Sequence, residues 1–461
     1  MTTLGDFFRS EIVFWAAWVI IPVIMEIIPT IVNFFILLKR RIQYKKKLRG
    51  STREPEVAIL IPVYNSQSTL RACIESVYLS DYPKDKMNVI LANNMTQDES
   101  FKVYAECHKE FPGLHINWVN SDQGKSKALN LAIFNSEGEY IIHIDSDGIL
   151  EKSAIRNTVN YLDKHPDVQC VTGTVLTNMN IIDKTENFFL RLFQKMEFGE
   201  YCQAFLSGRN FQSELNSIFT LSGAFSGFRK SAIMKTRLYN FDTLCEDTHV
   251  TFQIRDIMDG KVALCSDAIF FVDPIESAGK LYVQRQRWQI GELEVLHMFR
   301  KKKDMKLGLR YITDFVIRLI VFDHTFAFPR MIWYFALLAL ALINYPFKLI
   351  VVSVILLFLM YSLTNFLLYL CINLFLVDFD ELRHYYARKW YLIFLLPIFN
   401  FITFWFRFAG IINSTYNKER SWSTRNFDQE RGDFFKVVGK DLSFITNIVS
   451  RIRKEVNSNE A

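Results

Sequence analysis

The fold is built around one stretch in the first third of the chain: Tyr140-Ile141-Ile142-His143-Ile144-Asp145-Ser146-Asp147-Gly148. Its apolar, β-branched first half predicts a buried strand, and the glycine permits a turn directly after the two aspartates. Carboxylates at alternate positions of an extended chain point to the same side, where both can address one hard cation. The competing interpretation is a surface turn rich in aspartate, because an isolated Asp-x-Asp pair is a weak motif.

The chain is longer than one compact domain and is rich in apolar residues. It has 461 residues, of which 50% are hydrophobic and 42 are phenylalanine. Domains usually hold roughly 100 to 200 residues, so more than one unit is expected. The 7 cysteines include no Cys-x-x-Cys pair, which argues against a zinc site or a disulfide framework and suits a reducing compartment. The net charge of +6 comes from basic clusters beside apolar segments, and no nucleic-acid-binding signature accompanies them.

Residues 12–38 predict an N-terminal transmembrane anchor. Glu26 is the only charged residue in this stretch, which is longer than the about 20 residues that cross a bilayer. Basic residues follow at 39–41 and 45–47, and the positive-inside rule then places the next segment in the cytoplasm. A cleaved signal peptide is the alternative, but the apolar stretch is too long and lacks a small-x-small cleavage site.

Residues 57–268 predict an α/β domain. Apolar runs at 57–63, 88–92, 115–119 and 140–144 read as strands, and amphipathic segments lie between them. Residues 68–79 predict a helix, because Leu70, Ile74 and Val77 share one face after serines suited to N-capping. This alternation implies a mostly parallel sheet covered by helices on both faces, a nucleotide-binding type of fold that does not by itself define a function.

Three uncharged runs predict C-terminal transmembrane helices, at residues 331–347, 349–377 and 390–406. Charges interrupt the apolar residues at 307–325, which favours a helix in the membrane interface. Three spans would put the tail, residues 413–461, outside the cell, whereas its Lys and Arg content favours the inside. Either one run is re-entrant, with 390–406 a candidate because of Pro397 and Asn400, or residues 307–325 span after all.

Further motifs supply residues suited to the acidic strand end. Lys125 precedes the acidic strand and can offer an ammonium group to a diphosphate, and residues 222–229 contain small side chains that let a backbone approach a substrate closely. The remaining motifs are Pro62-Val63-Tyr64-Asn65, Cys245-Glu246-Asp247 and Gln284-Arg285-Gln286-Arg287-Trp288. Each is weak alone, and the pentapeptide at 284–288 also suits an amphipathic helix with a structural Trp.

In this order and at this spacing, the motifs resemble the processive, membrane-embedded glycosyltransferases of family 2, which include hyaluronan, chitin, cellulose and bacterial poly-N-acetylglucosamine synthases. The resemblance covers residues 57–298 by motif and the flanking apolar segments by layout. It implies a GT-A fold, a UDP-sugar donor, Mg²⁺ or Mn²⁺, and inverting elongation of a β-linked polysaccharide. It also implies a multi-pass protein of a bacterial cell membrane with a cytoplasmic catalytic domain, the lipid bilayer and cell-envelope proteins as partners, and no nucleic acid.

The resemblance also assigns roles to single residues. Asp247, with Glu246 beside it, is the expected base toward the acceptor, and Asp147 the expected metal ligand. Residues implied to bind the nucleotide-sugar are Pro62, Tyr64, Asn65, Asn93, Lys125 and Asp145; those implied to bind the acceptor are Gly223, Ala224, Phe225, Gln284, Arg287 and Trp288. The late stretch Ser421-Trp422-Ser423-Thr424-Arg425 resembles a segment that closes over the nucleotide, with Trp422, Thr424 and Arg425 matching. The alternative for it is headgroup anchoring beside a membrane helix.

One departure concerns the second strand. Many members of the family carry Asp-Asp-Gly-Ser after it, whereas this chain has Asn93-Asn94-Met95-Thr96. An asparagine still donates and accepts hydrogen bonds but brings no charge, so the nucleotide's identity is less defined than the family implies. Cys245 stands where Thr or Gly is more usual, and no effect is expected from it.

The expected organisation has five parts: an anchor with a basic juxtamembrane segment (1–50), a cytoplasmic GT-A domain (51–298), interfacial helices (299–330), C-terminal transmembrane helices (331–412) and a basic cytoplasmic tail (413–461). Two other functions stay open. A transferase that adds one sugar to polyprenyl phosphate or another lipid would differ in product length, and a non-catalytic exporter subunit would bind no UDP-sugar. The sugar itself is not readable, because pocket contacts outside these motifs decide donor choice.

Overall fold

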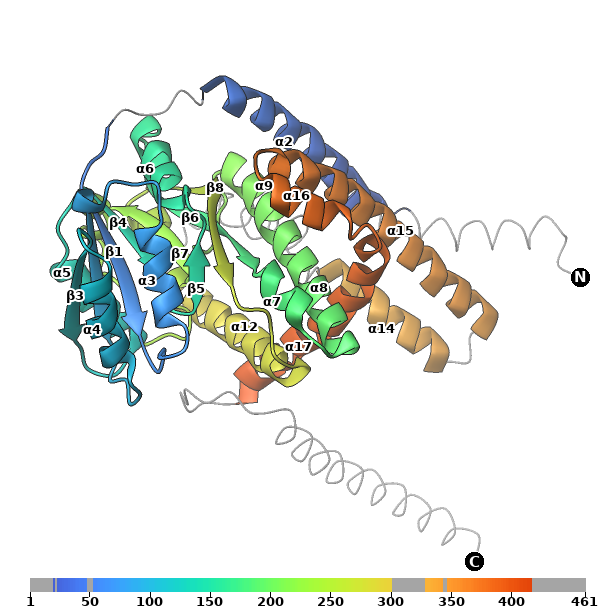
Figure 1. Cartoon of the computed structure of the whole chain (residues 1–461). Helices are drawn as coiled ribbons and strands as arrows, with labels where there is room; N and C mark the ends of the chain where they lie inside the picture. The colour runs from blue at the N-terminus through green and yellow to red at the C-terminus, as the bar shows by residue number, and fades with distance from the viewer. Residues whose placement is uncertain (1–19, 21–22, 48–52, 301–327, 343–345, 417–461) are drawn as a thin grey trace, which may run out of the picture.

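The computed structural model describes residues 20, 23–47, 53–300, 328–342 and 346–416 (Figure 1). Within these residues the centre of the protein is one eight-stranded sheet with the strand order β3-β2-β1-β4-β7-β6-β8-β5. The strands are β1 (Val57–Val63), β2 (Met87–Asn93), β3 (His115–Asn120), β4 (Tyr140–Ile144), β5 (Gly148–Leu150), β6 (Val168–Thr177), β7 (Phe225–Arg229) and β8 (Lys261–Val272). The strand that precedes the two aspartates, β4, lies in the interior of the sheet between β1 and β7.

The first half of the sheet is parallel. β1 pairs in parallel with both β2 and β4, and β2 pairs in parallel with β3, which confirms the four strands predicted from the apolar runs. All residues of β1 and β4 are buried, as expected for strands that are covered on both faces. The connecting helices are α3 (Leu70–Tyr78), α4 (Ser100–Glu110) and α5 (Lys125–Phe134). Parallel pairing brings the carboxyl ends of these strands to one edge of the sheet.

The second half of the sheet is mixed, so the expectation of a mostly parallel sheet is correct only for the first half. β7 runs antiparallel to both β4 and β6, and β5 runs antiparallel to β8, while β6 and β8 are parallel. The predicted serine cap of α3 is also wrong. Its N-cap residue, Thr69, makes no side-chain cap hydrogen bond, and the first amide groups of the helix donate instead to the Ser66 carbonyl.

A helical segment connects β6 to β7 and faces the terminal helices (Figure 1). It consists of the α-helices α7 (Met179–Lys184), α8 (Phe188–Cys202) and α9 (Asn210–Glu214), with the π-helix η3 (Gln203–Arg209) between α8 and α9. The other helices of the α/β domain are η2 (Lys84–Lys86), α6 (Ala154–Lys164), α10 (Lys230–Ile233), α11 (Glu246–Phe252), η4 (Gln253–Ile257) and α12 (Ala278–Arg300).

The apolar helices come from both ends of the chain: η1 (Val23–Ile27), α2 (Ile28–Lys47), α14 (Phe328–Leu342), α15 (Phe347–Phe375), η6 (Leu376–Asp378), α16 (Asp380–Ala387) and α17 (Leu392–Tyr416). Among the described residues, two helices are long and apolar enough to cross a membrane, Phe347–Asp378 and Leu392–Asn413. They correspond to the runs predicted at 349–377 and 390–406. The N-terminal anchor is not one of the two and stays a prediction, and residues 307–325 lie outside the described part.

The terminal helices and the α/β domain are packed together. Cys371, Ile372 and Phe375, at the end of α15, belong to the same buried core as the sheet. On α2, the buried Arg41 forms an ion pair with the partly exposed Asp378, and the Arg40 Nε atom lies 3.2 Å from a carboxylate oxygen of Glu214 on α9. The basic residues that follow the predicted anchor therefore hold α2 against α9 and the end of α15, besides any role in membrane orientation.

Candidate active site

The strand order reverses between β1 and β4, and open α/β sheets bind ligands outside the carboxyl ends of their strands at such a point. Val63 at the end of β1 is in register with Asn93 at the end of β2, and the Asn94 amide donates to the Val63 carbonyl at 2.9 Å. Asp145 follows directly after β4, the other neighbour of β1. The ends of three strands thus meet at one edge of the sheet. They bring together Tyr64 and Asn65 after β1, Asn93 and Asn94 at the end of β2, and Asp145 after β4.

Asp145 is held by an ammonium group. The Lys125 Nζ atom donates to the Asp145 carboxylate at 2.5 Å, and the Nε2 atom of the buried His143 lies 3.6 Å from the same oxygen. Burial alone would raise the pKa of Asp145, but Lys125 and His143 outweigh it and hold that pKa well below its usual range. The Lys125 side chain is 33% exposed, so it can exchange a carboxylate oxygen for a ligand oxygen. Lys125 and Asp145 form a permanently charged pair at the switch point.

Asp147 lies two positions further and is exposed. Loss of solvent on its protein side, together with the nearby Asp145 carboxylate, raises the pKa of Asp147 to about 6. Among the described residues, no three His, Cys, Asp or Glu side chains converge as a metal site. Magnesium is commonly held by one or two carboxylates, with substrate phosphates and water completing the shell. Asp147, with Asp145 already engaged by Lys125, therefore fits a cation that arrives with a diphosphate.

A second pair of carboxylates lies opposite the first. Glu246 and Asp247 begin α11, and one oxygen of Glu246 is 3.7 Å from the Lys125 Nζ atom. The Thr248 amide donates to the Asp247 carboxylate at 2.7 Å. Burial first and the adjacent Glu246 second raise the pKa of Asp247 to about 6. Lys125 thus joins Asp145 to Glu246, two residues about a hundred positions apart, in one ion-pair network, and Asp247 adjoins it.

The loop at 222–225 closes this network from the side of β7. The Asp145 amide donates to the Ala224 carbonyl at 3.1 Å, and Lys125 Nζ donates to the Gly223 carbonyl at 3.4 Å. A Cβ atom at Gly223 would lie 3.1 Å from an Asp247 carboxylate oxygen, which leaves room there for hydrogen only. Phe225 does not reach the site, because its ring is buried in the core against Gly173 and Phe270. Its assignment as an acceptor contact is corrected to a core position.

The side of the site that is predicted to bind the nucleotide consists largely of side-chain amides. The Asn93 side chain donates to Asn120 Oδ1 at 3.0 Å and accepts from the Thr96 amide at 2.9 Å. Asn65, with a positive φ of 48°, accepts from the Gln97 amide at 2.9 Å. Asp98, which comes later than the usual acidic pair, accepts from the Thr96 hydroxyl at 2.8 Å, and several further bonds lower its pKa although burial opposes them. Asp98 thus holds the loop that follows β2 in place.

The two other residues predicted on this side differ in exposure. Tyr64 is exposed beyond the end of β1 and is free to contact a ligand. Pro62 is buried within β1, in register with Ala92 of β2. Its assignment as a nucleotide contact is therefore corrected to a role in the strand.

The pentapeptide of residues 284–288 lies on α12, which packs along α17. Arg287 is exposed, and Gln284 and Trp288 are half-buried. The Gln284 Oε1 atom is buried without a hydrogen-bond partner in the described structure. The Cys245 thiol donates to the Trp288 carbonyl at 3.8 Å, so the helix abuts the start of α11 and its two carboxylates. Gln284, Arg287 and Trp288 therefore lie on a helix that contacts both α11, which carries Asp247, and the candidate membrane span α17.

Sequence reasoning missed three supporting features. Arg285 forms a buried ion pair with Glu200 of α8 and lies 4.5 Å from the Trp288 ring, which fixes the orientation of α12. Arg209 is a buried cation close enough to Asp247 to favour its charged form. Cys245 fills the space above Gly291, where a Cβ atom would lie 2.4 Å from the Cys245 sulfur, so this close packing requires a glycine at position 291. No local signal marks these contacts; only the charge of Arg285 and Arg209 inside helical segments hints at a buried partner.

Trp422, Thr424 and Arg425 lie outside the described residues, so the closing role predicted for them remains a prediction.

An α/β sheet with paired carboxylates beyond the carboxyl ends of its strands has the architecture of the GT-A glycosyltransferases. The solved mannosyltransferase PcManGT from Pyrobaculum calidifontis, in complex with GDP-Man and Mn²⁺, shares this fold with a TM-score of 0.53 and 16% identity, over 86% of this chain and 100% of that one.

The sequence comparisons agree with the fold. The family described as "Glycosyl transferase family 2" matches residues 58–237. A poly-beta-1,6-N-acetyl-D-glucosamine synthase from Staphylococcus epidermidis is 27% identical over 244 residues, which are 52% of this chain and 55% of the relative. The synthase of Staphylococcus aureus (strain COL) is 24% identical over 282 residues, 60% of this chain and 64% of the relative. The chain thus spans 55% and 64% of the lengths of these two relatives. Residues 58–237 therefore form a domain that matches glycosyl transferase family 2, within an α/β fold of the GT-A type.

Proposed function

We propose that the chain is an inverting, metal-dependent glycosyltransferase of a bacterial cell membrane, which uses a UDP-sugar on its cytoplasmic side to elongate a β-linked polysaccharide. The observation that carries this proposal is the network in which Lys125 joins Asp145 to Glu246, beside Asp247. It puts groups suited to a diphosphate and a group suited to a proton within one site. The likeness to poly-N-acetylglucosamine synthases supports polymer formation, and the two apolar helices support the membrane location and a route for the product.

On the donor side, Lys125, held by Asp145, would orient the diphosphate, and Asp147 would hold Mg²⁺ or Mn²⁺. When bound, the cation neutralises the negative charge that develops on the leaving diphosphate. Lys125 contributes a second positive charge that is already in place, because Asp145 and Glu246 raise its pKa although burial opposes them. Tyr64, Asn65 and Asn93 lie at the adjoining strand ends, where they would contact the nucleoside.

On the acceptor side, Asp247 accepts the proton of the attacking hydroxyl. The acceptor oxygen bonds to the anomeric carbon from one face while the bond from that carbon to the diphosphate oxygen breaks on the other, so the configuration inverts. A pKa of about 6 leaves Asp247 ionised at neutral pH yet basic enough to take a proton in the transition state. Gln284, Arg287 and Trp288 would hold the acceptor end, since a sugar's C–H face stacks on an indole ring.

The test uses the full chain purified in detergent or nanodiscs with UDP-GlcNAc, UDP-Glc, UDP-GlcA and UDP-Gal in turn, with Mg²⁺ or Mn²⁺. One donor should give a polymer. Asp247→Asn should slow its formation strongly, and Asp85→Asn, which removes an exposed carboxylate away from the site, should not. A product with one sugar on a lipid would replace elongation by single transfer. Failure to bind any UDP-sugar in the presence of Mn²⁺ would favour the exporter subunit.

A further inference from the structure

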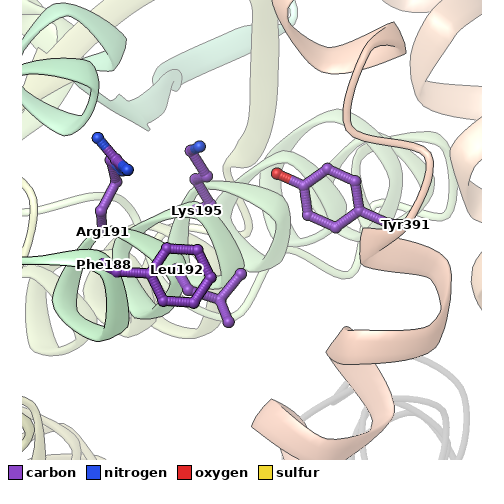
Figure 2. Close-up of a pocket in the computed structure, with 5 residues that line it drawn as sticks. All are labelled: Phe188, Arg191, Leu192, Lys195 and Tyr391. Carbon is purple, nitrogen blue, oxygen red and sulfur yellow. The ribbon is translucent and has the colours of Figure 1, made fainter.

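A pocket lies where α8 meets the residue that precedes α17 (Figure 2). Its volume is about 290 Å³, and it is lined by Phe188, Arg191, Leu192, Lys195 and Tyr391. The first four belong to the first two turns of α8, and Tyr391 faces them with its hydroxyl directed toward the helix (Figure 2). We call it the α8 pocket. It is separate from the carboxylate network and is used by no step of glycosyl transfer.

The two cations of the α8 pocket have no protein partner among the described residues. Arg191 and Lys195 are one helical turn apart, so they share a face of α8. Within the described residues, neither side chain has a hydrogen bond or an ion pair. Arg191 is the fourth and Lys195 the eighth residue of the helix. An anion in the pocket would offset the mutual repulsion of the two cations.

A third cation strengthens the positive potential. Lys389 is buried, and its Nζ atom donates to the Tyr385 carbonyl at 3.2 Å. Burial lowers the pKa of Lys389 to about 8; Asp183 opposes this, and Lys195 and Arg388 add to it. Asp183 is an acidic group nearby, and its carboxylate accepts a hydrogen bond from the Tyr385 hydroxyl at 3.2 Å. Lys389 thus adds a third cation beside Arg191 and Lys195.

The α8 pocket also has a defined position relative to the proposed bilayer. Tyr391 immediately precedes the candidate span Leu392–Asn413, so the pocket lies at the level where that helix would enter the bilayer. Phe189 beside it is 79% exposed and Trp390 is 59% exposed. Exposed aromatic rings at the end of a membrane helix are typical of the headgroup region. The surroundings of the pocket are thus cationic at one side and apolar at the other.

We propose that the α8 pocket binds the phosphodiester headgroup of an anionic glycerophospholipid. Arg191 and Lys195 donate to the phosphate oxygens, the Tyr391 hydroxyl donates a further hydrogen bond, and Phe188 and Leu192 lie against the start of the acyl chains. The inference rests on the membrane location given under the proposed function. Because α17 also packs on α12, where Asn413 donates to Gln286 at 3.0 Å, the bound lipid would brace the helix that carries the acceptor motif.

The test measures lipid retention by native mass spectrometry on the full chain in detergent, without any sugar nucleotide. Short-chain phosphatidylglycerol should bind about thirtyfold more tightly than phosphatidylcholine, and Arg191→Gln with Lys195→Gln should lose about the same factor, since each basic group near an anionic headgroup contributes about fivefold. Arg191→Lys with Lys195→Arg keeps both charges and should retain binding. Lys109→Gln with Lys235→Gln removes two exposed charges elsewhere and should change nothing.

Equal retention of the two lipids, or unchanged binding in the double glutamine variant, would overturn the proposal. Displacement of phosphatidylglycerol by an equal concentration of inorganic phosphate would assign the site to free phosphate instead. Thermal unfolding of each variant shows whether it is folded, and the charge-keeping variant separates loss of charge from loss of packing. Since no donor is present, a negative result leaves glycosyl transfer untouched, and absence of polymer leaves lipid binding measurable.

Discussion

The edge of the sheet that carries the candidate site has two halves, which differ in the groups that form them: one is held by ion pairs and the other by side-chain amides. In the charged half, Lys125, Asp145 and Glu246 hold one another by ion pairs, and both Asp145 and Lys125 stay partly exposed. In the amide half, Asn93 and Asn120 bond to each other, and the Asn94 side chain accepts from the Gly124 amide. The amide half thus satisfies itself within the protein. The charged half keeps groups that a ligand can engage.

This difference separates chemistry from shape. A bond-breaking step needs a group whose charge responds to the substrate, and the Asp247 carboxylate beside the charged half, whose pKa is raised by burial and by Glu246, provides that. A nucleoside pocket needs donors and acceptors held in place, and amides provide that without charge. We therefore expect changes in the charged half to act on turnover and changes in the amide half to act on donor affinity.

The largest effect is expected for Asp247. Replacement by Asn keeps the shape and the hydrogen bond from the Thr248 amide but removes the base, so kcat should fall by about a thousandfold. Radiolabelled UDP-sugar turnover measures this, with Asp85→Asn as the control. Turnover of Asp247→Asn at the rate of the unaltered protein would remove Asp247 from the role of base.

The next effect is expected for Lys125. Its replacement by Met leaves Asp145 and Glu246 without their shared cation, and loss of one preorganised charge toward the diphosphate should lower kcat by about a hundredfold. Lys125 also lowers the pKa of Asp247, so its loss should move the acidic limb of the pH profile upward. Lys125→Arg should keep most of the activity. If Lys125→Met changes only the KM for the donor and leaves kcat unchanged, the charged half would act on affinity, and the distinction between the charged half and the amide half would be wrong.

A smaller effect follows from pH. Asp247 acts as its carboxylate, and its pKa is raised to about 6, so kcat should be constant above that value and fall about tenfold for each further pH unit below it. The measurement is the pH profile with saturating donor. The residual activity of Asp247→Asn should lack this limb. An acidic limb near pH 4 would show that burial does not perturb Asp247 in the working enzyme.

The smallest effect is expected in the amide half. Asn93→Ala removes the bonds to Asn120 and Thr96, which should raise the KM for the donor by about tenfold with kcat within about twofold. The matched control is Asn88→Ala, which removes a similar amide pair with Asn117 at the other end of the same two strands. If the two variants behave alike, Asn93 stabilises the sheet and does not shape the nucleoside pocket.

The strands that carry the site were predictable because their signals are local. Apolar runs of five to seven residues with polar ends define β1, β2 and β4, and parallel pairing of such runs brings their ends together. The antiparallel β7 was not predictable, because residues 225–229 reach the sheet through a long helical segment that reverses the chain direction. The cap of α3 was also mispredicted, since the Ser66 carbonyl there competes with the serine side chains.

By itself the sequence determined the residue types of the site, the position of Asp145 and Asp147 after a buried strand, and the length of the two apolar helices, because composition and periodicity act over a few neighbouring residues. Only the tertiary structure decided which groups meet. Lys125 pairs with Asp145 and Glu246, Arg285 turns inward to Glu200, and Phe225 enters the core. Arg191 and Lys195 have no partner within the part of the chain that the structure describes. Such contacts join residues far apart in the chain, and local spacing holds no information about them.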